Sequence, residues 1–426
     1  MPGSQGRSFT FEQSPFTSCG QPHEPVILIP VIIEVSYGSK LQIKWDSDKC
    51  LLEPTIKNQR LRCQMRIIHA LSPFIFLIIN MQKIFFLFIL ICTFAYQASF
   101  AAEIDSVTTR KIKLDNSLAI INTIINQRIQ EGIQKANAQQ DNVGDFDYIY
   151  DTDEEDVEEY EACDEDVLYT ELRKAIFQSF TASWGLKGYD LDKQLRSLLA
   201  RQSYSLSLND SIYRDIDYIE GFSLNIKELS DVVNIDGHLI GLDKIGHFFA
   251  EGWQYFELIH YDDYTIDQAL EWGRQQEAGK FGYSTTGIFS FADLVANFNG
   301  SRFWNKVLLK ENDPLKGAFA NFFDRPYITC DIQIIASIKN RKIVKAWEFN
   351  TRFDLSDFVD GTWDEGNNCN SYDDPIIEEK VSARIKNVSP DFTCPLIAEY
   401  CLKAQEKYGY YAKHVLHPYC LIVTKE

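Results

Sequence analysis

The chain has 426 residues, of which 45% are hydrophobic and 24% are charged, as in folded globular proteins rather than in disordered ones. Asp and Glu outnumber Lys and Arg by 61 to 42, which gives a formal net charge of -19 at pH 7. Because such an acidic chain repels phosphate backbones, and because no glycine-rich phosphate loop is present, nucleic acid is excluded as a partner.

The segment after Met81 has the three-part pattern of a secretory signal peptide. Lys83 precedes an apolar run at 84–96, and small residues follow up to Ala101. This pattern predicts a signal peptide at 81–101, cleaved after Ala101. Residues 1–80 are then a non-native or disordered N-terminal extension. The alternative is an uncleaved segment that anchors the chain in a membrane, because residues 67–80 are also apolar.

The region 102–140 is predicted to contain one amphipathic helix, from Ile112 to Ala138. Its isoleucines recur at helical spacing, and Asp115 or Asn116 is a suitable cap. Packing on the core is the expected use of its apolar stripe. Residues 141–166 follow with 14 acidic side chains, which repel one another and predict a disordered linker.

The rest of the chain divides into a helical domain at 167–325 and a cysteine-rich lobe at 326–426. The lobe begins with a predicted hairpin whose strands are 327–338 and 342–353. Six cysteines follow the cleavage site, an even number that predicts three disulfides in an exported chain, with 15 possible pairings. The fold class is therefore mainly α, with a helical main domain and a small disulfide-stapled α+β C-terminal lobe.

The segment 241–261 contains the densest set of side chains suited to chemistry. Asp243, His247 and Glu251 follow one another at four-residue steps, so they share one face of a helix that opens near Asp243. Gly246 and Gly252 interrupt this helix and predict a close approach by another element. The aromatic residues around them predict a buried helix.

Two further helices are predicted after the central one, with a long loop between them. Thr265 and Gln268 have the spacing of a capping box at the start of the first helix. Ser290 and Asp293 have the same spacing at the start of the second helix, with Asp in place of Glu. Residues 278–289 read as a glycine-bearing loop, and loops of this length are often functional. Glu277 before the loop and Asp293 after it add carboxylates, and Asn297 lies four residues beyond Asp293.

Asp243, His247 and Glu251 are candidate ligands of a divalent metal, because helical His with carboxylates four residues away is a common donor set. The H-E-x-x-H pattern of zinc proteases and the G-x-S-x-G pattern of serine hydrolases are both absent. As catalytic residues, His247, Glu251, Glu277 and Asp293 would line a cleft and serve acid–base chemistry. The alternative is a buried polar network in which Asp243 caps its helix and His247 is a hydrogen-bonded core residue.

Four short motifs resemble those of uncharacterised exported bacterial proteins. They are D-K-I-G-H-F-F-A-E-G at 243–252, T-T-G at 285–287, F-A-D-L-V-A-N at 291–297 and F-V-D-G-T-W-D-E-G at 358–366. The short D-K-I-G-H-F helix is also similar to that of VanZ-like proteins, although the several membrane spans of those proteins are missing. The resemblance implies a bacterial envelope or secreted protein and brings no established activity.

These observations lead to two hypotheses about function. The first is an exported hydrolase that acts on an envelope component and is periplasmic or secreted. The second is a non-enzymatic envelope protein, structural or bound to a protein partner, that would contact a membrane only through an uncleaved signal segment. The surroundings of His247 discriminate between them: convergence with Glu251 and Asp293 on an open pocket favours the hydrolase, and burial favours the network.

Overall fold

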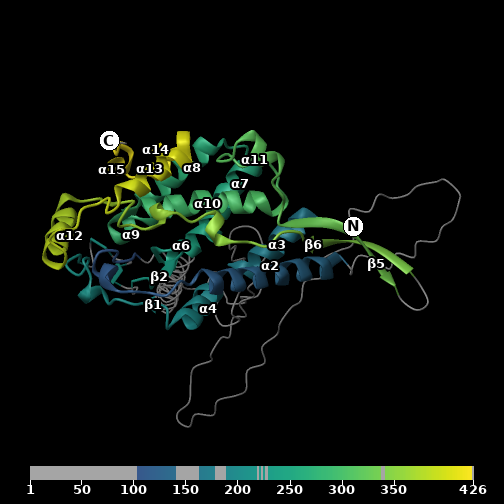
Figure 1. The fold of residues 1–426 in the computed structure, drawn as a ribbon, viewed down its shortest axis with the longest axis horizontal. Coiled ribbons are helices and arrows are strands. Elements are labelled where there is room, and N and C mark those ends of the chain that lie inside the picture. Colours follow the sequence, from purple (N-terminus) through teal and green to yellow (C-terminus); the bar gives the residue numbers. More distant parts are fainter. Residues whose placement is uncertain are drawn as a thin grey trace, which may run out of the picture. The chain divides into compact units, whose positions relative to one another are not determined.

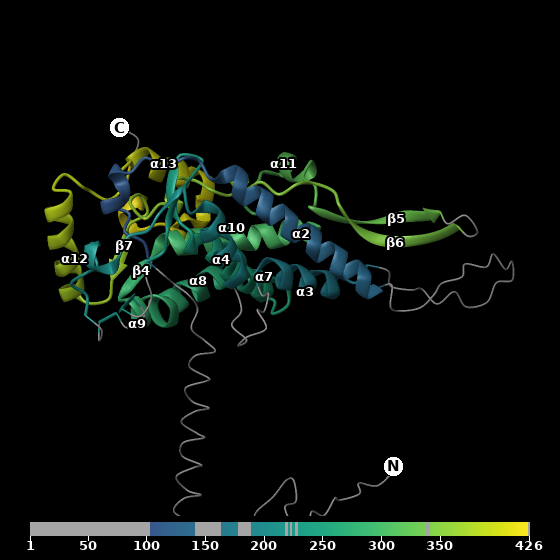
Figure 2. The same ribbon diagram turned by 90° about the horizontal axis from the view of Figure 1, so that it is seen from below.

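The computed structural model describes residues 103–140, 163–177, 189–217, 220–221, 224–225, 229–336 and 341–424, all within the compact unit Phe88–Glu426. The predicted N-terminal extension, the predicted signal peptide and residues 141–162 of the acidic linker lie outside the described residues. The described part is mainly helical with three small antiparallel sheets (Figures 1 and 2), which confirms the predicted fold class.

The described helices and strands follow the chain in four groups. The first group is η2 (Thr108–Lys111), α2 (Leu118–Gln140), α3 (Glu165–Ile176), α4 (Tyr189–Leu199), β1 (Ser203–Tyr204) and η3 (Leu208–Asp210). The second is β2 (Val232–Ile235), β3 (His238–Gly241), α6 (Asp243–Gly246), η4 (His247–Glu251), α7 (Gly252–His260), α8 (Ile266–Gln276) and η5 (Glu277–Phe281). The third is α9 (Tyr283–Thr286), β4 (Ile288–Ser290), α10 (Phe291–Leu308), α11 (Ala318–Phe322), β5 (Ile328–Ala336) and β6 (Arg341–Phe349). The fourth is η6 (Leu355–Asp357), η7 (Gly361–Trp363), β7 (Asn370–Tyr372), α12 (Pro375–Val388), α13 (Ala398–Tyr408), η8 (Gly409–Tyr411), α14 (Ala412–Val415) and α15 (Pro418–Leu421).

The helix α2 packs on the core through its isoleucines, as predicted. It begins at Leu118 rather than at Ile112. At this start, the side chain of Asn116 accepts a hydrogen bond from the Leu118 amide. The end of the acidic linker is structured, contrary to the prediction of a disordered segment up to residue 166. There, the side chain of Asp164 accepts from the Val167 amide and caps α3.

The central helical segment runs from Asp243 to His260 as α6, η4 and α7. The middle part, His247–Glu251, is one turn of π-helix. A β-hairpin formed by β2 and β3 leads into the segment, and α10 packs along it (Figure 1). Aromatic side chains from both helices, among them Phe248 and Trp304, are buried between them. The predicted burial of this segment is confirmed.

Two glycines let α7 and α10 approach closely. A Cβ atom at Gly252 would lie 2.6 Å from the Cα of Gly300, and one at Gly300 would lie 1.8 Å from the carbonyl oxygen of Phe248. The close approach predicted at Gly252 is therefore confirmed. The one predicted at Gly246 is wrong, because no other element of the described chain comes within 4 Å of a Cβ at that position.

Substituting Gly300 by alanine should destabilise the protein. Because the added methyl group meets backbone rather than a flexible side chain, we expect the free energy of unfolding to fall by about 2–3 kcal/mol, near the upper end of the range for overpacked cores. Urea unfolding of the variant measures this loss. Gly246→Ala is the matched control, expected to be neutral or stabilised by up to about 1 kcal/mol. Equal losses in the two variants would contradict the proposed contact.

The capping predictions for the next two helices are confirmed. Thr265 forms a capping box with Gln268 at the start of α8, and the Ser290 side chain accepts from the Asp293 amide at the start of α10. The predicted loop 278–289 is more regular than expected, since it contains the end of the π-helical turn η5, the short helix α9 and most of β4. Strand β4 pairs with β7, which places Ser290 opposite Asn370.

The chain beyond residue 326 begins with the predicted hairpin, formed by β5 and β6. Its base is bound to α2, where the side chain of Asn137 donates to and accepts from the backbone of Trp347, both at 2.9 Å. The three predicted disulfides are present, as Cys163–Cys330, Cys369–Cys394 and Cys401–Cys420. None of the described helices is long and apolar enough to cross a membrane.

Candidate functional site

Eight charged side chains lie together at the point where the central helical segment meets α10. We call this group the ionic cluster: Glu103, Asp243, Lys244, His247, Glu251, Glu277, Asp293 and Glu365. Every member is at most 8% exposed. The first turns of the central segment supply four members, and the Ser290 cap orients α10 so that Asp293 faces them. Glu365 comes from the loop that precedes β7.

Lys244 lies at the centre of the cluster and is fully buried. Its ammonium nitrogen lies 2.7 Å from Oδ2 of Asp243, 2.5 Å from Oδ1 of Asp293 and 2.6 Å from Oε1 of Glu365. Burial alone would lower the pKa of Lys244, but these carboxylates, Asp243 first, raise it well above its usual value. Lys244 is therefore a permanent cation that joins three separate parts of the chain.

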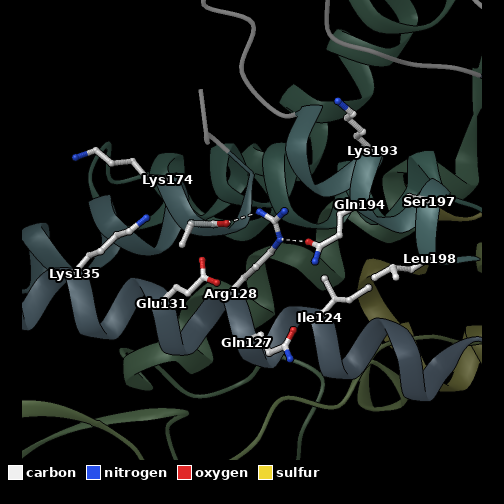
Figure 3. A pocket seen from close by; sticks show the side chains of 11 residues that line it. Ile124, Gln127, Arg128, Glu131, Lys135, Lys174, Lys193, Gln194, Ser197 and Leu198 are labelled. Atoms are coloured by element: carbon white, nitrogen blue, oxygen red, sulfur yellow. Dashed lines mark hydrogen bonds between the residues drawn. The ribbon is translucent and has the colours of Figure 1, made fainter. Parts of the chain in front are cut away.

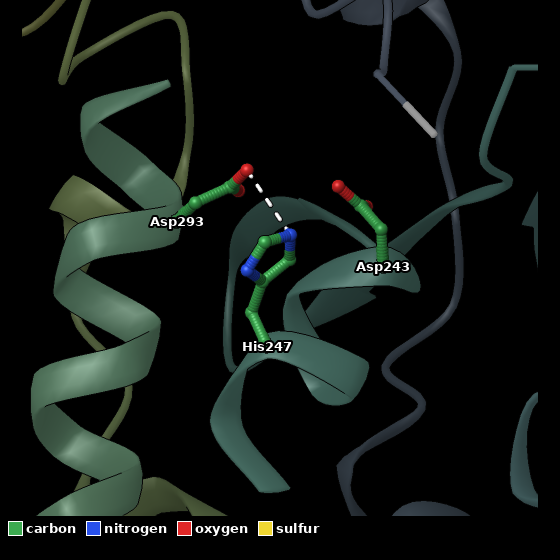
Figure 4. A group of neighbouring side chains, drawn as sticks. All are labelled: Asp243, His247 and Asp293. Atoms are coloured by element: carbon green, nitrogen blue, oxygen red, sulfur yellow. Dashed lines mark ion pairs between the residues drawn. The ribbon is translucent and has the colours of Figure 1, made fainter. Parts of the chain in front are cut away.

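His247 lies on the other side of Asp293. Its Nε2 is 3.2 Å from Oδ2 of Asp293 (Figure 4). Its Nδ1 is 3.2 Å from Oδ1 of Asn297. Burial opposes the charged form of the imidazole, but the carboxylates of Asp293 and Glu251 outweigh it and raise the pKa of His247 to about 9. Both ring nitrogens then carry protons at neutral pH and donate to the two oxygens.

Asp293 and Glu277 are neighbouring carboxyls with opposite ionisation. Burial would raise the pKa of Asp293, but the charges of His247 and Lys244 overcome it and lower that pKa below its ordinary value. For Glu277, burial and the charge of Asp293 raise the pKa to about 8, although its Oε1 accepts a hydrogen bond from the Ser290 amide at 3.0 Å. At pH 7, Asp293 is ionised and Glu277 holds a proton.

Two further carboxyls in the cluster also favour the protonated form. Burial raises the pKa of Glu365 to about 7, although Lys244 opposes this shift. Burial, followed by the charges of Glu365 and Asp293, raises the pKa of Glu103 well above its ordinary value. One oxygen of Glu103 accepts from the hydroxyl of Thr286 at 2.9 Å. Protons thus offset much of the negative charge that six buried carboxyls would otherwise carry.

The structure brings together all the residues singled out in the sequence around His247. Glu251, Asp293 and Asn297 lie against the imidazole, Glu277 is held near Asp293 by the Ser290 amide, and Asp243 shares Lys244 with Asp293. The expected open cleft is wrong for these side chains, because tight packing between the central segment and α10 leaves each of them at most 8% exposed. The convergence expected of a site and the burial expected of a polar network are therefore both present.

The described residues favour a metal-ligand set that differs from the predicted one at one position. The three residues whose donor atoms lie within 4.8 Å of one another are Asp243, His247 and Asp293, rather than Asp243, His247 and Glu251. Oε2 of Glu251 lies 3.9 Å from Nδ1 of the imidazole, whereas Oδ2 of Asp293 lies 3.2 Å from Nε2. Asp293 takes this place because it comes from the facing helix α10, which helical spacing within the central segment cannot reveal.

Sequence reasoning missed three members of the cluster. Lys244 could have been found, because a lysine beside Asp243 on a helix predicted to be buried has to be paired. Glu365 lay within a quoted motif, F-V-D-G-T-W-D-E-G, but nothing linked it to the central segment. Glu103 directly follows the expected start of the mature chain, and its position gave no sign of a role in the core.

A separate cavity lies between α2, α3 and α4 and has a volume of about 700 Å³ (Figure 3). Arg128 crosses it, donating to the Gln194 side chain at 2.9 Å and to the Ala175 carbonyl at 2.6 Å. None of the cluster residues lines this cavity.

Comparisons of the chain with protein-family models, with curated proteins and with solved structures found no match. The function therefore has to be argued from the ionic cluster itself.

Proposed function

We propose that this chain is an exported protein of the bacterial envelope in which the ionic cluster is a buried polar network with a structural role. The observation that carries this proposal is the burial of all eight charged groups. A polymeric envelope substrate needs an open cleft, whereas Lys244 has no exposed surface and His247 has only 3%. The partner would be an envelope component or another protein of that compartment.

Two features support export. The pattern at 81–101 is that of a signal peptide, and the three disulfides are typical of proteins that fold in an oxidising compartment. Membrane contact through an uncleaved segment at 67–96 is the alternative for the N-terminal region.

The second candidate is a hydrolase that acts on an envelope component, and the opposite ionisation of Asp293 and Glu277 favours it. Pairs of carboxyls whose surroundings separate their pKa values are the usual mark of acid–base catalysis. In this role Glu277 would give its proton to a leaving group, and Asp293 would orient His247 or bind the developing charge. Segments around the cluster would have to open to admit the substrate.

Glu277→Gln separates the two candidates, because glutamine resembles the protonated carboxyl but cannot donate an acidic proton. The mature protein, expected to begin at Ala102 by N-terminal sequencing, is incubated with isolated cell-wall material, and soluble fragments are measured. The structural role predicts no release by either protein, and a variant folded as well as the wild type at pH 7. Release by the wild type that falls about 100-fold or more in the variant would establish the hydrolase instead.

A further inference from the structure

Carboxyl groups outnumber the basic side chains of the ionic cluster. Six carboxyls surround one lysine and one histidine, and all eight side chains are buried. Two of their oxygens, Oδ1 of Asp243 and Oε2 of Glu103, are buried and have no hydrogen-bond partner among the described residues. Because an unsatisfied buried polar atom is costly, such a group points to a ligand that completes it.

The backbone gives an independent indication that this is a binding centre. Two turns of π-helix occur in the described part of the chain, His247–Glu251 and Glu277–Phe281, and both supply members of the cluster. A π-helical turn is rare and is frequently found at functional sites. A purely structural ion pair does not require a π-helical turn. A set of metal ligands must place its side chains at defined positions, and a π-helical turn changes the direction in which side chains leave the helix.

We infer that Asp243, His247 and Asp293 form a binding site for a divalent transition metal ion, with Zn²⁺ as the best-suited probe. One donor atom from each residue lies within 4.8 Å of the other two, and the side chains converge from two facing helices (Figure 4). Bonds to Zn²⁺ are about 2.0–2.2 Å long, so any two donors of a tetrahedral site lie about 3.4 Å apart. Small rotations of the three side chains are therefore enough to close the site.

The types of donor distinguish between metal ions. One imidazole and two carboxylates suit Zn²⁺ and its first-row neighbours, whereas Ca²⁺ requires six to eight oxygen ligands. Lys244 holds the other oxygen of Asp293, at Oδ1, and leaves Oδ2 facing the imidazole. Burial does not exclude a metal ion, because a metal ion can bind while the chain folds around it. A polymeric envelope substrate, in contrast, has to enter the folded protein. The inference therefore goes beyond the proposed structural role and does not depend on export or on hydrolysis.

The test is elemental analysis of the full mature protein after refolding with Zn²⁺ or with Ca²⁺, followed by dialysis. We expect one Zn²⁺ per chain and no retained Ca²⁺. Refolding with Co²⁺ should produce visible absorption bands from a nitrogen- and oxygen-ligated ion. Substoichiometric Zn²⁺, or equal retention of Zn²⁺ and Ca²⁺, would overturn the inference, and neither result would touch the proposed structural role.

His247→Gln identifies the ligand. We expect this variant to bind Zn²⁺ at least about 100-fold more weakly and to lose the Co²⁺ bands. His417→Gln is the matched control, because His417 is also buried but packs against Phe291 outside the cluster. Unchanged binding in His247→Gln, or an equal loss in both variants, would refute the assignment. If His247→Gln fails to fold, Asp243→Asn is measured in its place, with the same expected loss.

Discussion

Replacing Lys244 by methionine should lower the free energy of unfolding by about 3–5 kcal/mol at pH 7, the largest loss we expect from a single substitution in this chain. Methionine keeps most of the volume of the side chain but removes the ammonium group that lies within 2.7 Å of Asp243, Asp293 and Glu365. The carboxylates are then buried with no cation between them, which is the costly way to break a buried ion pair. Urea unfolding measures the loss.

Lys380→Met is the matched control, since it removes the same ammonium group from an ion pair that is partly open to solvent. Lys380 lies 2.6 Å from Glu220, but its side chain is 30% exposed. Pairs of this kind contribute about 0–1 kcal/mol, so we expect a small change. The loss in the Lys244 variant should also shrink toward pH 5, because Glu365, whose pKa is about 7, is then protonated and no longer needs a cation beside it. Equal losses for the two lysines would show that Lys244 is not the centre of the cluster.

The parts of the fold that depend on local chemistry were predictable from the sequence. Helix starts at Thr265 and Ser290 follow from side chains that bond to amides three residues away, and the hairpin follows from alternation and a turn. The extra order at 278–289 was not predictable in this way. Strand β4 exists because it pairs with β7, some 80 residues along the chain, and no local pattern encodes that pairing.

The candidate site shows the same limit. Spacing placed Asp243, His247 and Glu251 on one helix face, but it could not show that Asp293 from α10 would meet the imidazole. Glu365 lies 121 residues from its partner Lys244, and Glu103 lies 183 residues from its partner Thr286. The sequence therefore identified the helix that carries the centre, whereas tertiary packing determined which carboxyls complete it and how deeply they are buried.

The pH dependence of stability should reveal the protons that the cluster holds. In the metal-free protein, kept so by a chelator, the pKa is about 8 for Glu277, about 7 for Glu365 and about 9 for His247, against ordinary values of 4.5, 4.5 and 6.5. Between each pair of values the native state binds more protons than the unfolded state. Stability must therefore fall as pH rises, from about 4.5 for the two carboxyls and from about 6.5 for the histidine.

Below about pH 4 the sign reverses, because Asp293 has a lowered pKa and loses its ion pairs when it is protonated. We therefore expect maximal thermal stability between about pH 4 and 4.5 and a fall of at least about 5 °C in Tm by pH 8.5, at about 1.4 kcal/mol per pH unit for each extra proton held. Glu277→Gln removes one such proton, so its Tm should decline less steeply and exceed that of the wild type at pH 8.5. A wild-type Tm that is flat from pH 5 to 8.5, or parallel curves for the two proteins, would mean that Glu277 is ionised in the native state. The charge of the cluster would then have to be balanced by something other than protons.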